Sequence, residues 1–167
     1  GTLTATTNAG GLATFTNLSI TGTVGARTLL FTSPSLTQVV SGSVTTTAGA
    51  ATQIAINAGN GQTATVNTAV TTPLSVLVRD VSLNPVAGVS VTFGVASGGG
   101  SILPVAPVVT NASGIAALTS WTLGNLAGAN SVTATAAGLT GSPLTFTATG
   151  TAGTATMAVS TAAGKAS

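Results

Sequence analysis

The chain has 167 residues, yet only four of its side chains carry charge at neutral pH, namely Arg27, Arg79, Asp80 and Lys165. It has no histidine, cysteine, tyrosine or glutamate, so acid–base catalysis, an activated hydroxyl nucleophile and a metal site all lack the groups that they need. Three scattered cations cannot form the clustered basic face that binds nucleic acid, although the sequence pI is about 10.8. We therefore predict a protein that is not an enzyme, with no catalytic residue, no cofactor and no metal ligand.

Membrane insertion and disulfide bonding are also disfavoured. Mean hydropathy is +0.64, but Thr, Ser, Gly or Asn interrupts each apolar run. These runs stay well below the roughly 18 consecutive apolar residues of a membrane-spanning helix. The N-terminus, which opens at Gly1, lacks the basic and apolar regions of a signal peptide, so we expect a processed product or a window of a longer chain. Without cysteine, stability has to come from a buried core and from strand pairing.

Two strands are predicted in the middle of the chain. Residues 73–79 alternate between apolar side chains on one face and mostly polar ones on the other, and residues 89–95 do the same. This period of two is typical of a strand with one buried face. Asn-Pro and Gly within residues 80–88 predict a tight turn that joins the two strands.

Three more strands are expected at 115–123, 131–136 and 143–149, each bounded by Gly, Pro or Asn. The Ala-rich stretch 127–137 is expected to avoid a helix, because Gly, Asn and Thr interrupt it. Short strands at regular spacing predict an all-β sandwich. The expected core of residues 50–153 consists of Val76, Val78, Val91, Phe93, Trp121, Leu123, Val132 and Phe146.

An internal repeat is the most informative feature of the sequence. Residues 8–13 (Asn-Ala-Gly-Gly-Leu-Ala) resemble residues 111–116 (Asn-Ala-Ser-Gly-Ile-Ala), a displacement of 103 residues. The match continues with Leu18 on Trp121, Ile20 on Leu123, Gly25 on Gly128, Leu29 on Val132 and, after a one-residue slip, Gly49 on Gly153. A period near one hundred residues fits one immunoglobulin-sized module. We therefore expect residues 1–49 to pack as the later strands of a second sandwich that is not independently stable, with a core of Leu12, Leu18, Ile20, Leu29 and Phe31.

Several motifs occur in order within residues 50–153: Asp80 followed by Asn84–Val89, Val91–Phe93, Gly98–Gly100, Thr110–Gly114 and Gly128–Asn130. Together they resemble the bacterial immunoglobulin-like Big-1 domain of intimin and invasin-type adhesins. The resemblance implies tandem immunoglobulin-like Greek-key β-sandwiches with a stalk or presentation role at a bacterial surface. Two features depart from the family: Asn111 stands where an acidic residue is usual, and the chain is far less charged.

The repeat and the resemblance together divide the chain into three parts. Residues 1–49 are expected to be the second half of a preceding Big-1-like module, or a half-module completed by a neighbour. Residues 50–153 are expected to form a complete module. Residues 154–167 are expected to be the first strand of a following module or a donor strand.

The expected function is a non-enzymatic stalk, fibre or coat of an extracellular or cell-surface protein. Its partner would be itself, as a homopolymer or as tandem repeats, and beyond that a host or neighbouring-cell surface. The alternative is a filament subunit in which residues 154–159 insert into the incomplete module of a neighbour. The tail and the first 49 residues are together too short for one module, which favours a window of a longer chain. A carbohydrate-binding module is a distant third, because it rests on Trp121 alone.

Three local features have simpler explanations than a binding site. Asp80 beside Arg79 is expected to be a turn-capping carboxylate next to an outward-facing cation. The triplet Gly98–Gly100 precedes no helix pattern, so a loop between strands is favoured over a phosphate cradle. The glycosylation-like patterns at Asn17 and Asn111 are expected to be turn or strand residues.

Overall fold

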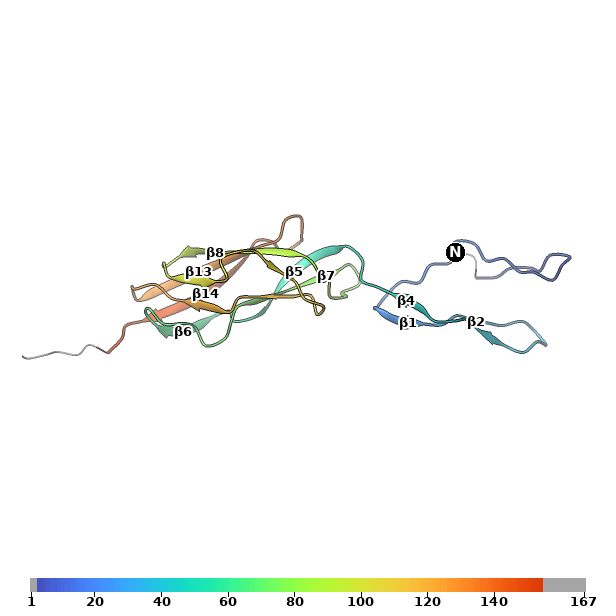
Figure 1. Ribbon diagram of the computed structural model, residues 1–167, viewed down its shortest axis with the longest axis horizontal. Coiled ribbons are helices and arrows are strands. Elements are labelled where there is room, and N and C mark those ends of the chain that lie inside the picture. The colour runs from blue at the N-terminus through green and yellow to red at the C-terminus, as the bar shows by residue number, and fades with distance from the viewer. Residues whose placement is uncertain (1–2, 155–167) are drawn as a thin grey trace, which may run out of the picture.

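The computed structural model describes residues 3–154, and within this range the chain is all-β with no helix. No segment in these residues has the helical length and apolarity that crossing a bilayer requires. Figure 1 shows an elongated molecule in which a small N-terminal segment and a larger body of strands lie in line. The N-terminal segment, residues 3–49, contains β1 (Gly25–Arg27), β2 (Leu30–Phe31), β3 (Val39–Val40) and β4 (Val44–Thr46).

The larger body contains the other ten strands of the described residues. The first five are β5 (Ala51–Ala58), β6 (Gln62–Thr65), β7 (Ser75–Asp80), β8 (Ser90–Ser97) and β9 (Ser101–Leu103). The last five are β10 (Val108–Val109), β11 (Ile115–Ala117), β12 (Ser120–Thr122), β13 (Gly128–Thr135) and β14 (Leu144–Thr151).

Two sheets make up most of this body. One has the strand order β10-β8-β13-β14-β6 and the other β11-β7-β5, while β9 and β12 pair separately. All pairings are antiparallel except that of β14 with β6. The two sheets enclose one apolar cluster, so the architecture is β-sandwich-like.

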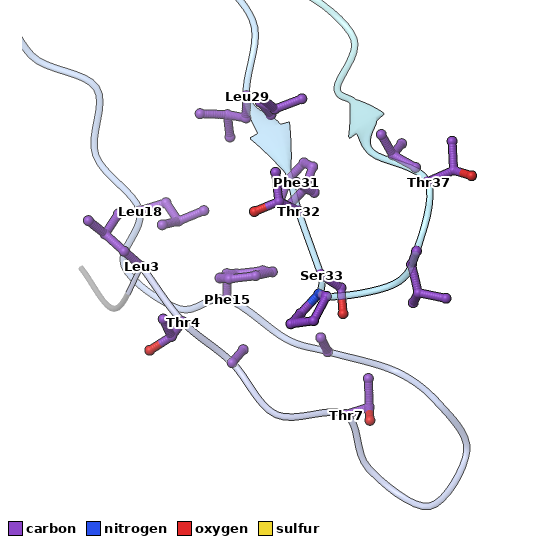
Figure 2. A pocket seen from close by; sticks show the side chains of 16 residues that line it. Leu3, Thr4, Thr7, Phe15, Leu18, Leu29, Phe31, Thr32, Ser33 and Thr37 are labelled. Carbon is purple, nitrogen blue, oxygen red and sulfur yellow. The ribbon is translucent and has the colours of Figure 1, made fainter.

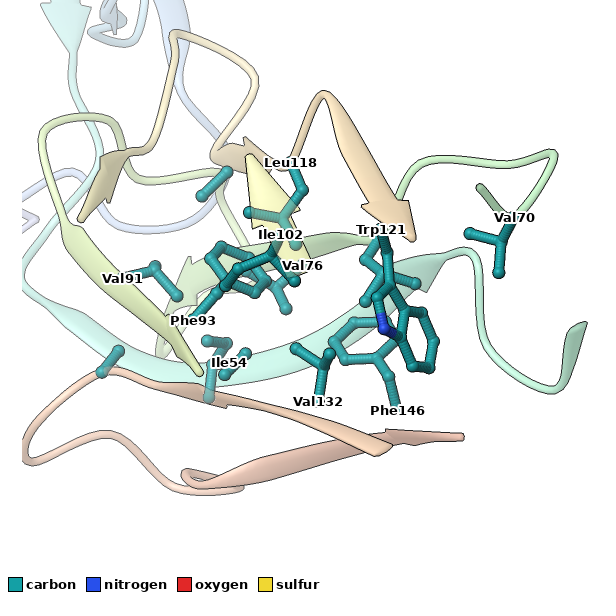
Figure 3. Packing of buried hydrophobic residues seen from close by; sticks show 14 of the residues in the cluster. Ile54, Val70, Val76, Val91, Phe93, Ile102, Leu118, Trp121, Val132 and Phe146 are labelled. Atoms are coloured by element: carbon teal, nitrogen blue, oxygen red, sulfur yellow. The ribbon is translucent and has the colours of Figure 1, made fainter. Parts of the chain in front are cut away.

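The core lies between these sheets, and Figure 3 shows aromatic and branched side chains from both of them meeting there. Trp121 and Phe146 are the largest fully buried side chains. All eight core positions predicted for residues 50–153 are confirmed, since each is at most 5% exposed. The alternation that predicted them is visible in β14, where every second residue from Phe146 to Gly150 is buried.

Two details of the predicted strands are wrong. The strands around 73–79 and 89–95 are not partners, because β7 pairs with β5 and β11 whereas β8 pairs with β10 and β13. Residues 81–89 therefore carry the chain from one sheet to the other. The run 115–123 is also not one strand: it is divided into β11, which pairs with β7, and β12, which pairs with β9.

The burial predicted for the N-terminal segment is wrong as well. Leu12 and Leu18 are 63% and 41% exposed, and Ile20, Leu29 and Phe31 are only half-buried. None of residues 3–49 is buried. The physical reason is that residues 3–154 provide two short strand pairs here and no second sheet to cover their apolar face.

Candidate functional site

The sequence predicts no catalytic, cofactor or metal residue, so a function of this chain would depend on its surfaces. Within residues 3–154, no three His, Cys, Asp or Glu side chains lie together. Trp121 is fully buried and cannot stack on a sugar. Gly98–Gly100 connects β8 to β9, as expected of a loop between strands. Three other features stand out: the loop at Asp80, an open apolar face and a turn that occurs twice.

The loop after β7 is organised by Asp80, which is 3% exposed. Its Oδ1 atom accepts hydrogen bonds from the backbone N–H groups of Ser82 and Asn84, at 2.8 and 2.9 Å. The turn-capping role predicted for Asp80 is therefore confirmed. Arg79 is exposed, and no ion pair joins it to Asp80 in the described part of the chain.

The same loop also binds the N-terminal segment. Oδ2 of Asp80 accepts hydrogen bonds from the backbone N–H of Gly49 at 2.9 Å and from Nδ2 of Asn84 at 3.0 Å. Asn84 in turn donates from Nδ2 to the carbonyl of Gly22 at 2.9 Å and accepts from the N–H of Val24 at 3.0 Å. We call these five residues the joint. They connect segments that lie about sixty residues apart in the sequence.

The motif that resembles the Big-1 family includes Asp80 and Asn84, but the joint could not be predicted from it. Their partners in the N-terminal segment contribute only backbone groups, which any residue type supplies. No residue pattern at 22–24 could therefore have revealed the contact. The one feature of the sequence that points to this loop is Asp80 itself, the single side-chain carboxylate in a chain with almost no charge.

The hydrogen bonds of the joint also set the ionisation of Asp80. The Asn84 amide and the N–H groups of Gly49, Asn84 and Ser82 hold the pKa of this carboxyl below its ordinary value, although burial acts in the opposite direction. The folded state therefore favours the ionised form. Its stabilising contribution is present above the ordinary Asp pKa of about 4 and is lost as the pH falls through the lower folded pKa.

We therefore predict a loss of stability in acid that depends on one residue. Because Asp80 is the sole side-chain carboxylate, the urea midpoint of the full chain should fall as the pH drops below the ordinary Asp pKa of about 4 and stay nearly flat above it. The Asp80→Asn variant should be less stable at neutral pH, since in either orientation its amide nitrogen would face a backbone N–H, that of Gly49 or those of Ser82 and Asn84. Its midpoint should change little in acid. Equal acid slopes for the two proteins would contradict this role of Asp80.

The open apolar face lies on the N-terminal segment, as Figure 2 shows. A groove of about 830 Å³ runs between residues 3–18 and residues 29–39. Phe15 and Phe31 meet there with ring centroids 5.5 Å apart, and Leu18 and Leu29 also line it. An unpartnered apolar surface of this kind is typical of an interaction site.

The internal repeat is present in three dimensions at the turn that begins at Asn8 in the N-terminal segment and at Asn111 in the larger body. Oδ1 of Asn8 accepts from the N–H groups two and four residues later at 2.9 and 3.0 Å, and Oδ1 of Asn111 does the same at 2.9 and 3.1 Å. In both copies the Asn backbone N–H donates to the carbonyl four residues later. A glycine with positive φ holds the third position after each Asn, at 78° in Gly11 and 71° in Gly114.

Strand register repeats as well. Gly25 lies opposite Thr46 in the pair β1–β4, and their equivalents Gly128 and Gly150 lie opposite each other in β13–β14. The next two residue pairs of each ladder also correspond. The pair β2–β3 differs from β13–β14 by one residue of register. The N-terminal hairpin is therefore a second, shorter copy of the β13–β14 hairpin.

The two hairpins differ in the strands that pair with their edges. In the larger body, β13 also pairs with β8, and β14 also pairs with β6. In the described residues, β1 to β4 have no further strand on either side. Leu18 and Leu29 line the groove, whereas Trp121 and Val132, which hold the equivalent positions in the larger body, are fully buried.

Comparison with known proteins gives no family. No protein-family model matches the chain, and no curated protein matches it significantly. Function has therefore to be inferred from the chain's own geometry, namely the repeated turn and hairpin, the joint and the open apolar face.

Proposed function

We propose that the chain is a non-enzymatic structural segment of an extracellular bacterial surface protein, in which tandem Big-1-like modules with the Greek-key immunoglobulin fold form a stalk, fibre or coat. The observation that carries the proposal is the repeat at 103 residues, which preserves both the Asn turn and the register of the following hairpin. The N-terminal segment and the larger body lie in line along the molecule, which supports an arrangement of successive modules (Figure 1).

In this arrangement the chain has three parts, with boundaries given by the repeat. Residues 1–49 are the second half of one module, whose first half would cover the open apolar face. Residues 50–153 are a complete module. Residues 154–167 are the start of a following module or a donor strand, and from residue 155 onward they lie outside the described residues.

The composition supports a structural role in which the main partner of the chain is another copy of the same chain or module. Soluble proteins normally protect strand edges and flat faces with Lys, Glu and net charge. Here only four charged side chains are available, and one of them, Asp80, is buried in the joint. Rows of Thr and Ser on exposed strand positions can form lateral hydrogen bonds without the desolvation cost of ions.

Localisation on native cells tests this function directly. Gold-labelled antibodies against residues 50–153 should decorate fibres or a coat on the outside of intact cells that make the protein. Protease added to the same cells should remove the label. Labelling confined to the cell interior would contradict the proposal.

Assembly of the native material is predicted to be insensitive to salt. Ion pairs and repulsion are nearly absent from the chain, so screening has little to act on, and packing with neutral hydrogen bonds has to hold neighbouring copies together. Each hydrogen bond contributes about 1 kcal/mol net, so a few paired strands suffice. Light scattering and electron microscopy from low to molar sodium chloride should show the same assemblies. Dissociation at high salt would contradict the prediction.

A filament subunit that assembles by strand donation is the second candidate. The open groove between residues 3–18 and 29–39 favours it, because such a groove is what a donated strand fills. The proposed donor, residues 154–159, lies almost wholly outside the described residues. The first candidate is preferred because one donated strand cannot replace all the strands that the first copy lacks.

A further inference from the structure

The joint takes only backbone groups from the N-terminal segment: the Gly22 carbonyl, the Val24 N–H and the Gly49 N–H. Each of these positions has an equivalent at the far end of the larger body. The displacement of 103 residues places Gly22 on Asn125 and Val24 on Ala127. With the one-residue slip, Gly49 falls on Gly153.

The two ends are equivalent in geometry as well as in sequence. The hydroxyl of Thr46 donates to the carbonyls of Thr23 and Gly25 at 3.1 and 3.0 Å. Gly150 holds the position of Thr46, and a Cβ placed on Gly150 would lie 3.3 and 3.5 Å from the two equivalent carbonyl oxygens. The loop before β13 therefore lies against its hairpin as the loop before β1 does.

These far-end groups are open. Asn125, Ala127 and Gly153 are exposed, and neither the carbonyl of the first nor the N–H groups of the other two form a hydrogen bond within residues 3–154. Leu126, between the first two, is 74% exposed. At the near end, by contrast, Asn84 and Asp80 engage all three equivalent groups.

We infer that Asn125, Ala127 and Gly153 form a docking surface for the loop equivalent to Asp80–Asn84 of a following module on the same polypeptide. The side-chain amide equivalent to Asn84 would donate to the Asn125 carbonyl and accept from the Ala127 N–H. The carboxylate equivalent to Asp80 would accept from the Gly153 N–H. Every junction in the array would then contain the same joint, which fixes how each module is oriented on the one before it. The inference rests on the proposed function, because it requires a following module.

The chain itself favours the same polypeptide over a second copy as the source of this loop. In a second copy, Asp80 and Asn84 are already engaged by the N-terminal segment of that copy. Beyond the hairpin, residues 153–156 (Gly-Thr-Ala-Thr) repeat residues 49–52 (Gly-Ala-Ala-Thr), the segment that leads from Gly49 into β5. The sequence after β14 thus continues as a following module would.

A full chain in which residues 50–153 are duplicated in tandem tests this inference. Because the protein has no cysteine, a Val105→Cys change in each sandwich, at a position that is 75% exposed, gives a unique pair of sites for nitroxide labels. Pulsed electron paramagnetic resonance should then report one narrow distance. Asn84→Ala in the second copy alone should abolish the narrow distance. The matched control Val81→Ala, in the same loop and 82% exposed, should preserve it.

A second variant separates loss of docking from loss of folding. Ala127→Pro in the first copy removes the receiving N–H without touching the loop, and it should broaden the distance in the same way. Fluorescence of the buried Trp121 in each sandwich shows that both remain folded. An equal distance distribution for the parent, Asn84→Ala and Ala127→Pro chains, whether narrow or broad, would overturn the inference. The proposed function fails separately, on the surface labelling of native cells.

Discussion

An isolated peptide of residues 1–49 is expected to show no cooperative unfolding transition, whereas residues 50–153 should unfold in one cooperative step. None of residues 3–49 is buried, and the strands there are only two or three residues long. Isolated two-stranded hairpins are at best marginally stable in water. Circular dichroism during a urea or thermal titration measures the difference.

Hydrogen exchange in the full chain provides the matched control for this prediction. The amides of Val24 and Gly49 are bonded to the joint, so they should exchange more slowly than other amides of the N-terminal segment. In the isolated peptide this protection should disappear. A sharp, concentration-independent unfolding transition of the monomeric peptide would show that residues 1–49 are a domain of their own.

Trp121→Ala is expected to lower the free energy of unfolding of the full chain by about 3–5 kcal/mol, the usual cost of removing a large buried aromatic side chain. Trp121 is fully buried and is the largest side chain of the core. Total stabilities of such domains are about 5–15 kcal/mol, so the variant should be close to unfolding. Urea denaturation followed by circular dichroism measures the loss.

Two further variants make this result specific. Val105→Ala removes an apolar side chain that is 75% exposed and should change stability by less than about 0.5 kcal/mol. Trp121→Phe should cost clearly less than Trp121→Ala. It keeps most of the packing and removes Nε1, which is buried without an acceptor in the described residues. A loss under about 1 kcal/mol for Trp121→Ala would mean that the core is not organised around this residue.

The core could be predicted from the sequence because its cause is local. Alternation along residues 73–79 shows which face of a strand is apolar, and Val76 and Val78 are fully buried on that face. The same pattern at Leu18 and Leu29 shows which face of the N-terminal segment is apolar. It contains no information on whether a second sheet packs against that face. Burial was therefore predicted correctly in one copy and wrongly in the other.

Features that depend on distant partners could not be predicted in this way. Alternation across residues 115–123 continues through the point where the chain leaves β7 to pair with β9, so the change of partner has no signal in the pattern. The turn formed by Asp80 was predicted because a carboxylate bonds its own backbone. Its bond to Gly49 was not, because a backbone N–H thirty-one residues away is not encoded by residue type.

The intact mass of the protein extracted from its native source tests the central claim most directly. A tandem array of modules predicts a polypeptide several times heavier than the 15.7 kDa of the present chain, with residues 50–153 as one of its repeats. Denaturing electrophoresis with antibodies against this segment, followed by mass spectrometry, gives the answer. A single species at 15.7 kDa would contradict the array and favour a discrete filament subunit.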